Sequence, residues 1–186
     1  MRVVSGKFGS RPLKAVPGDN TRPTTDKIKE SIFNLIGGQL SGGYALDLFG
    51  GSGALGIEAV SRGADHAVIC EKYRPAIETI EKNIAMTKEE NSFTILKGDN
   101  LKSLAKHKQK HESLRFDWVF IDPPYKKQQI QDNILWLERN NCLSSEAMIV
   151  CESDSDTVLD QDIGQWHLIK EKSYGLTMIR IYQRSE

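Results

Sequence analysis

The sequence is poor in the residues that define disulfide-rich and metal-binding proteins. Its 186 residues include three cysteines, Cys70, Cys142 and Cys151, with no Cys-x-x-Cys spacing among them. An odd number of scattered cysteines predicts reduced thiols in a cytoplasmic protein, and argues against a disulfide framework or a zinc site. The four histidines are scattered too, so we expect no bound metal.

Long apolar runs and an excess of one charge are also missing. No run approaches the roughly 20 residues of a membrane-spanning helix, and the start, MRVVSGKFGS, lacks the apolar centre of a signal peptide. Lys and Arg total 25, as do Asp and Glu, so any attraction to a polyanion has to be local. The composition, 39% hydrophobic and 27% charged, is typical of a soluble globular protein with one core.

From residue 44 onward, short apolar runs alternate with stretches of helical period. Strands are expected at 44–49, 66–71, 92–97, 118–122 and 147–152. Helices are expected from the glycine-rich turn to about residue 62, from Pro75 onward, around 101–108 and over 130–139. This alternation predicts an α/β fold, a parallel sheet with helices on both faces. Two further strands, 166–172 and 176–183, leave no room for a crossover helix, so the last should run antiparallel to its neighbours.

The first part of the chain reads as an extension, and we divide the chain into residues 1–40, packed on the core, and a main domain, 41–186. Residues 2–4 and 13–16 could pair as a small β-hairpin, and 24–36 has the period of a helix capped by Thr24 or Thr25. Up to residue 23 the basic residues outnumber the acids five to one, which makes a local basic patch.

A glycine-rich turn follows the first strand of the main domain. Gly51, Gly53 and Gly56 fit the pattern G-x-G-x-x-G, and Glu71 ends the second strand about 20 residues later. This placement predicts a cofactor with an adenosine-like part across the carboxyl ends of the strands. We expect the backbone of the turn to approach it and Glu71 to accept hydrogen bonds from ribose hydroxyls.

Asp47, at the end of the first strand, favours S-adenosylmethionine over NAD. A carboxylate repels the pyrophosphate of NAD and attracts the ammonium and sulfonium of S-adenosylmethionine, by a few kcal/mol at ~4 Å. The alternative is that Asp47 only caps the following turn. Asp99, in the turn after the third strand, would reach the adenine amino group, although Gly98-Asp99-Asn100 is also ordinary turn chemistry.

The stretch Asp122-Pro123-Pro124-Tyr125 ends another strand at the same edge of the sheet. The Asp122 carboxylate and the Pro123 carbonyl could accept hydrogen bonds from the two N–H groups of an exocyclic amino group. This would localise the lone pair of its nitrogen toward the methyl group of the donor. Proline stiffness would hold that carbonyl in place, and Tyr125 offers a ring on which a displaced base could stack. Methyl transfer would then depend on positioning and electrostatics. The alternative is a surface turn covered by the tyrosine.

With these motifs in place, the sequence resembles the RsmD family, which methylates the N2 amino group of one guanine in bacterial 16S ribosomal RNA. The segments that carry the resemblance are 2–6, 21–26, 46–49, 51–56, 61–64 and 122–125. One departure is Gly50, where the family more often has alanine. The resemblance implies a Rossmann-like class I methyltransferase fold with a mostly parallel seven-strand sheet, S-adenosylmethionine as donor, and the assembled or assembling small subunit as substrate.

The resemblance and the motifs together define the expected site. Catalytic roles are expected for Asp122, Pro123, Pro124 and Tyr125. Donor contacts are expected from Asp47, Phe49, Gly51, Ser52, Gly53, Glu71, Lys72, Asp99, Asn100 and Asp122. RNA contacts are expected from the N-terminal extension, at Arg2, Lys7, Arg11, Arg22 and Thr24, by charge and shape.

The residues alone do not choose guanine over adenine or RNA over DNA. Methylation of another amino group, such as adenine N6 in DNA or RNA, is therefore the main alternative. The chain has no separate base-reading module after its core, which favours RNA. A nucleotide-binding oxidoreductase and an assembly factor without turnover are the other hypotheses. We expect a monomer with no membrane partner.

Overall fold

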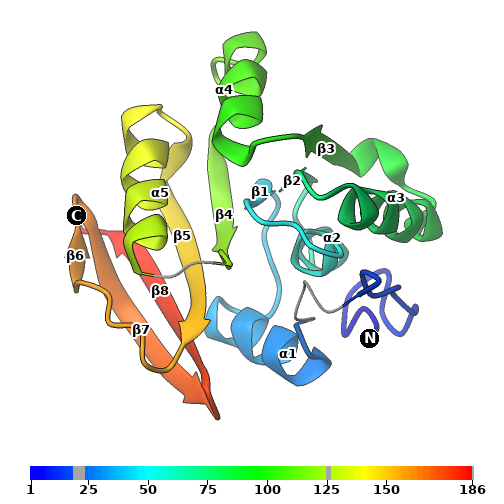
Figure 1. Cartoon of the computed structure of the whole chain (residues 1–186), viewed down its shortest axis with the longest axis horizontal. Coiled ribbons are helices and arrows are strands. Elements are labelled where there is room, and N and C mark those ends of the chain that lie inside the picture. Colours follow the sequence, from blue (N-terminus) through cyan, green and yellow to red (C-terminus); the bar gives the residue numbers. More distant parts are fainter. Residues whose placement is uncertain (19–23, 125–126, 186) are drawn as a thin grey trace.

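The computed structural model describes residues 1–18, 24–124 and 127–185 and is built around one mixed sheet (Figure 1). Its eight strands lie in the order β3-β2-β1-β4-β5-β8-β7-β6. The strands are β1 (Tyr44–Asp47), β2 (His66–Glu71), β3 (Phe93–Lys97), β4 (Phe116–Ile121), β5 (Leu143–Asp154), β6 (Asp162–Ile163), β7 (Trp166–Tyr174) and β8 (Thr177–Arg184). Hydrogen bonding is parallel from β3 to β5 and antiparallel at β5–β8, β8–β7 and β7–β6.

The predicted direction of the last strand is confirmed, since β8 is antiparallel to both β5 and β7. The expected number of strands is one too low. The additional strand, β6, has two residues and pairs only with β7 at the edge of the sheet. A two-residue strand has too little alternation to be recognised in a sequence.

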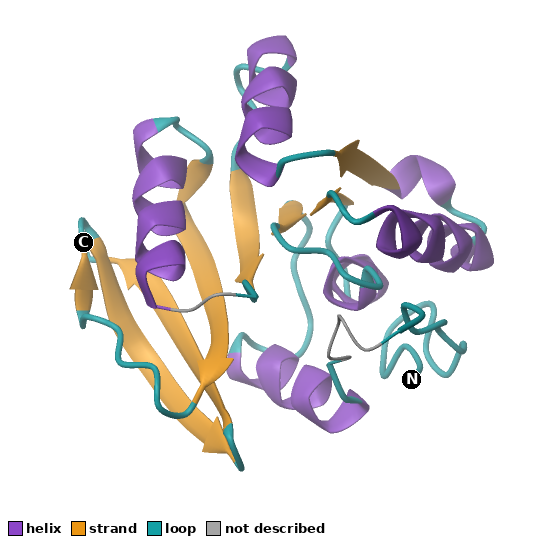
Figure 2. Cartoon of the chain, in the orientation of Figure 1, coloured by secondary structure: helices purple, strands orange, loops and turns teal. Residues whose placement is uncertain are grey.

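Helices cover both faces of the sheet, as predicted (Figure 2). They are α1 (Asp26–Leu35), α2 (Ala54–Ser61), α3 (Arg74–Thr87), α4 (Asn100–Lys110) and α5 (Lys127–Arg139), with a 3₁₀ turn at Glu90–Ser92. Successive residues of a strand point to opposite faces. Ala45 of β1 therefore joins the core under α1, α2 and α3, whereas Leu46 joins the core under α4 and α5.

The N-terminal extension lies beside α2 and α3 (Figure 1) but does not form the expected two-stranded hairpin. One antiparallel bridge joins Arg2 and Pro12. Two backbone hydrogen bonds flank this bridge, Val3 N to Arg11 O and Leu13 N to Met1 O, and Ser5 N donates to Glu58 instead of continuing the ladder. Val3, Phe8 and Leu13 are buried in the same core as α1, α2 and α3, so the extension packs on the core. The boundary near residue 40 stays a prediction.

The predicted cap of the first helix agrees with the structure. Thr25 is the N-cap of α1, and its Oγ1 accepts a hydrogen bond from Ile28 N at 3.2 Å.

All three cysteines are buried and free, and burial raises the pKa of Cys142 to about 11. Within the described residues, no helix is long and apolar enough to cross a membrane, and no group of His, Cys, Asp or Glu could hold a metal.

Candidate active site

A cleft of about 900 Å³ opens at the carboxyl ends of the parallel strands. Parallel strands end at one edge of the sheet, and there the chain leaves for each helix, which is where ligands bind in such folds. The cleft brings together most of the predicted donor-contacting residues: Asp47, Phe49, Gly51, Ser52, Glu71, Lys72, Asp99, Asn100 and Asp122. Gly53 does not line it and instead forms the N-cap of α2.

The glycine-rich turn is shaped by close packing on one side and open space on the other. Gly51 has φ +58°, and a Cβ there would meet no atom within 4 Å, which leaves room for a ligand beside the backbone. A Cβ on Gly56 would lie 2.9 Å from the Ile69 side chain, so the glycine lets α2 pack close to β2. Gly50 is also tight: a Cβ there would lie 2.5 Å from Ile69 Cγ2, so an alanine at this position would require Ile69 to shift.

Glu71 holds the glycine-rich turn against the end of β2. Its Oε1 accepts a hydrogen bond from Gly51 N at 2.8 Å, and its Oε2 accepts from Lys72 N at 2.9 Å and Tyr73 N at 2.8 Å. A carboxylate has about four lone-pair sites, so Oε1 can accept a further hydrogen bond. Glu71 can therefore serve the turn and a ribose hydroxyl together.

Asp47 has a structural role that sequence reasoning left as the alternative. Its carboxylate is 2% exposed, and Oδ2 accepts a hydrogen bond from Gly56 N at 3.2 Å in the first turn of α2. The hydrogen bond expected from the capping alternative is therefore present, and Asp47 also lines the cleft, so its contact with the donor stays a prediction. Burial raises the pKa of Asp47 well above its usual value, and the charges of Asp122 and Glu71 raise it further. A cation in the cleft would oppose this shift.

Asp99 and Asn100 lie where β3 turns into α4. Asp99 is the N-cap of α4, and its Oδ2 accepts a hydrogen bond from Lys102 N at 3.0 Å. Asn100 Nδ2 donates to Leu48 O at 3.2 Å, which ties this turn to the end of β1. Both residues line the cleft, and the adenine contact of Asp99 stays a prediction.

The predicted catalytic segment follows β4 directly. Asp122, Pro123 and Pro124 all line the cleft, with Pro123 buried and Pro124 exposed. Asp122 is near enough to Asp47 to raise the pKa of that carboxyl group. Tyr125 lies outside the described residues. The clamp on an amino group stays a prediction, but Asp122 and Pro123 line the same cleft as the residues expected to bind the methyl donor.

The N-terminal extension forms part of the cleft. Thr24 and Thr25, at the start of α1, line it together with Ala15, Val16 and Ile28. We call Ala15 and Val16, with Thr24, Thr25 and Ile28, the N-terminal wall. The wall places the expected RNA-contacting residue Thr24 at the cleft.

Three basic residues of the extension, Arg2, Lys7 and Arg11, have partners within the chain. Arg2 Nε lies 3.6 Å from Asp26 Oδ2, and Lys7 Nζ lies 2.7 Å from Glu89 Oε2. Arg11 Nη1 donates to the carbonyl of Thr87 at the end of α3, at 3.1 Å. Arg22 lies outside the described residues. RNA contact by these residues stays a prediction, and Arg11 has a structural role that sequence reasoning missed.

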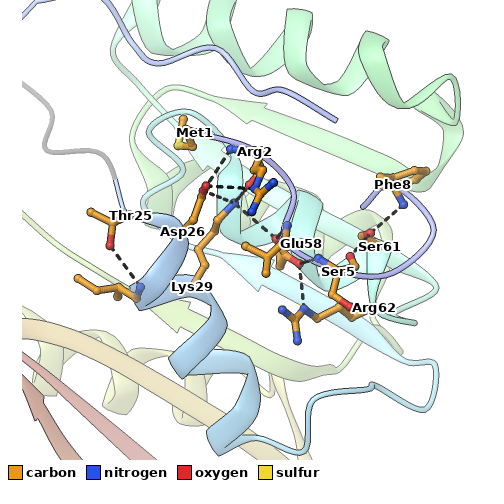
Figure 3. Close-up of polar contacts among 12 residues, drawn as sticks. Met1, Arg2, Ser5, Phe8, Thr25, Asp26, Lys29, Glu58, Ser61 and Arg62 are labelled. Carbon is orange, nitrogen blue, oxygen red and sulfur yellow. Dashed lines mark hydrogen bonds and ion pairs between the residues drawn. The ribbon is translucent and has the colours of Figure 1, made fainter. Parts of the chain in front are cut away.

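A buried charged cluster, also missed, anchors the extension (Figure 3). Lys29 of α1 and Glu58 of α2 are both 0% exposed, with 3.4 Å between Nζ and Oε1. Glu58 also accepts hydrogen bonds from Val4 N at 2.9 Å, Ser5 N at 3.0 Å and Arg62 Nε at 2.9 Å. Burial lowers the pKa of Lys29, and Glu58 opposes that shift. The sequence signal that could have indicated this cluster is the position of Lys29 on the apolar face of the predicted helix 24–36.

Three comparisons with known proteins extend this picture. A family model described as Conserved hypothetical protein 95 matches residues 1–183. The ribosomal RNA small subunit methyltransferase D of Escherichia coli strain K12 is 34% identical over 184 residues, which cover 99% of this chain and 90% of that protein. The putative rRNA methyltransferase YlbH of Bacillus subtilis strain 168 is 39% identical over 184 residues, 99% of each chain. A solved structure, described as putative methyltransferase yhhF from Escherichia coli, matches with a TM-score of 0.81 and 32% identity over 100% of this chain and 98% of that one.

The structure has the features of the class I methyltransferase fold: a mostly parallel sheet, a glycine-rich turn after β1, and acidic residues at the carboxyl ends of the strands. This confirms the predicted fold class. The family model and the relatives also identify the family within this fold class, because they match nearly the whole length of the chain. The chain belongs to the RsmD family.

Proposed function

We propose that this protein transfers a methyl group from S-adenosylmethionine to the N2 amino group of one guanine in 16S ribosomal RNA. The observation that carries the choice of donor is the charge of the cleft, and the family carries the choice of acceptor. The described lining of the cleft includes Asp47, Glu71, Asp99, Asp122, Glu152 and Asp154, against a single basic residue, Lys72. Such a lining attracts a cationic donor and repels the pyrophosphate of a dinucleotide.

The residues of the cleft fit the parts of that donor. The open space beside Gly51 accommodates an adenosine moiety, Glu71 accepts from the ribose, and Asp99 and Asn100 lie at the adenine end. The cationic donor opposes the raised pKa of Asp47 and so favours its ionised form, which provides negative charge for the ammonium and sulfonium. When bound, S-adenosylmethionine supplies an electrophilic methyl group. The choice of this donor over another nucleotide rests on charge and on the family.

On the acceptor side, Asp122 and Pro123 hold the amino group. The Asp122 carboxylate and the Pro123 carbonyl accept hydrogen bonds from its two N–H groups and direct the nitrogen lone pair into the cleft. Orientation of this kind accounts for a large part of catalysis in bimolecular transfers. The proton lost from the methylated nitrogen passes to Asp122 or to water. Tyr125 would stack on the guanine after the base leaves its own stack.

The partner proposed for the chain is 16S rRNA in the small subunit or in an assembly intermediate, in the cytoplasm, with the protein acting as a monomer. The relatives support this partner, since the Escherichia coli protein is named a small-subunit rRNA methyltransferase. We expect the RNA backbone to enter the cleft past the N-terminal wall, which includes Thr24. Arg2 and Lys7 are exposed and can exchange their acidic partners for phosphate.

The proposal is tested with tritiated S-adenosylmethionine and three acceptors: small subunits lacking the modification, naked rRNA and DNA. We expect label in the 16S rRNA of small subunits. Label confined to DNA would favour the adenine-N6 alternative, and no transfer with intact donor binding would favour an assembly factor.

The Asp122→Asn variant tests the clamp within this assay. We expect transfer to fall by on the order of 10³-fold, because an amide group puts donors where the amino group needs acceptors. Binding of S-adenosylhomocysteine should stay within a few-fold of the wild type. Glu112→Gln, an exposed acid after α4, is the matched control and should retain full activity. Undiminished transfer by Asp122→Asn would refute the clamp.

A further inference from the structure

One buried amide group, that of Asn83, joins the glycine-rich turn to the N-terminal extension. Asn83 belongs to α3 and is 1% exposed. Its Oδ1 accepts a hydrogen bond from Lys14 N at 2.8 Å. Its Nδ2 donates to Lys14 O at 3.0 Å and to Ser52 O at 2.9 Å. Both amide hydrogens and the oxygen are therefore bonded to backbone atoms of two segments far apart in the sequence.

Both of these segments line the cleft. Ser52 belongs to the turn after β1, beside Gly51. Lys14 directly precedes Ala15 and Val16 of the N-terminal wall. Among the described residues, the other hydrogen bond between these segments is a weak one, from Ser52 Oγ to Met1 Sδ at 4.0 Å. Asn83 is thus the main polar link between the donor side and the wall.

We propose that Asn83 is a positioning residue that couples donor binding on the glycine-rich turn to the placement of the N-terminal wall. This inference rests on the proposed function, since it assumes that the donor binds at the turn. Loss of a hydrogen-bond partner is costly for a buried amide group such as that of Asn83, so movement of Ser52 O strains this amide group and, through it, both polar backbone atoms of Lys14. A donor that fixes the turn therefore fixes Ala15 and Val16 before RNA arrives, which is a coupling between two sites.

The extension has other anchors on and near α3, so loss of Asn83 should uncouple the wall without detaching it. Arg11 Nη1 donates to Thr87 O, and Lys7 pairs with Glu89. Neither contact touches the glycine-rich turn. Variants at position 83 can therefore separate a coupling role from a purely structural one.

Hydrogen exchange of individual amides, with and without S-adenosylhomocysteine, tests this coupling. In the wild type we expect the ligand to slow exchange both at residues 51–53 and at Ala15 and Val16, by on the order of tenfold or more. In Asn83→Ala the protection at 51–53 should remain and the protection at Ala15 and Val16 should disappear. Asn83→Asp keeps the acceptor for Lys14 N but lacks both donors, and it should behave in the same way if the alanine variant does not fold.

Thr79→Val is the matched control, because Thr79 is also buried on α3 and its hydroxyl donates only to Pro75 O, at 2.9 Å. It should lower the melting temperature while leaving the ligand-induced protection of Ala15 and Val16 intact. We also expect kcat to fall on the order of tenfold in the Asn83 variants and to stay unchanged in Thr79→Val.

The possible results separate the inference from the proposed function. Equal protection of Ala15 and Val16 in the wild type and in the Asn83 variants overturns the coupling and leaves donor binding standing. Absence of protection at residues 51–53 in the wild type overturns donor binding at the turn, and the coupling with it.

Discussion

Replacement of Glu58 by glutamine should be among the most destabilising conservative changes in this protein. The Glu58 carboxylate is fully buried and holds four donors: Val4 N and Lys29 Nζ at one oxygen, Ser5 N and Arg62 Nε at the other. Glutamine has one oxygen, so its amide NH₂ would face one of these pairs of donors. Arg62 would also lose its buried counter-ion, and Lys29 would keep Asp26, at 3.9 Å, as its acidic partner.

The magnitude follows from this loss. Removal of one partner from a buried ion pair costs about 3–5 kcal/mol. In a chain of this size, 1 kcal/mol shifts the melting temperature by roughly 2–4 °C, which gives a drop of about 6–20 °C. Lys29→Met should cost less, near the lower end, because Glu58 keeps its three other donors.

Calorimetry or urea unfolding measures the effect, and the chain provides its own control. Arg74 and Glu78 form the same kind of i,i+4 pair, but their side chains are 90% and 59% exposed. Glu78→Gln should change the free energy of unfolding by no more than about 0.5 kcal/mol. If Glu58→Gln cost no more than Glu78→Gln, the idea that the buried cluster holds the extension on the core would be refuted.

Three further predictions concern the turn, the cap and the N-terminal extension. Burial raises the pKa of Asp47, so between its unfolded and folded pKa values the native state binds more protons than the unfolded state, and stability falls as pH rises. Unfolding curves measured at several pH values between 4 and 8 give the free energy of unfolding as a function of pH. Asp47→Asn should remove its decrease with rising pH, and an unchanged decrease would contradict the assignment to Asp47. Asp99→Ala should cost about 1 kcal/mol through loss of the α4 cap and also weaken S-adenosylhomocysteine binding in calorimetry, whereas unchanged affinity would leave Asp99 as a cap alone. Gly6→Ala should lower the melting temperature far more than Gly18→Ala, because both glycines have positive φ but only at Gly6 would a Cβ clash, 1.9 Å from Ser61 O. Equal effects of these two alanines would contradict the close contact between the extension and α2.

The main domain could be predicted from the sequence because its signals are local. Alternation of apolar runs with helical period placed strands β1 to β5 and the helices between them. The glycine spacing and Glu71 located the turn, and the position of Asp122 after β4 put it at the same edge of the sheet. These features depend on residues close together in the chain, and the order of a parallel α/β sheet does the rest.

The N-terminal extension could not be predicted in the same way, because its partners are distant. A hairpin was expected from apolar residues flanking a turn, yet the pairing stops at one bridge between Arg2 and Pro12. Val4 and Ser5 are held instead by Glu58, and Lys14 is held by Asn83. The side chain of Arg11 likewise donates a hydrogen bond to a backbone carbonyl at the end of α3 instead of facing solvent. A buried glutamate or asparagine with backbone partners gives no periodic signal in a sequence.

Location of the methyl group tests the central claim most directly. Small subunits lacking the modification would be incubated with the protein and S-adenosylmethionine, and the digested 16S rRNA would be analysed by mass spectrometry. The account predicts one methylated guanine carrying the methyl on N2, absent when Asp122→Asn replaces the wild type. A methyl group on a ring nitrogen, or on the exocyclic amino group of adenine, would contradict the guanine-N2 assignment.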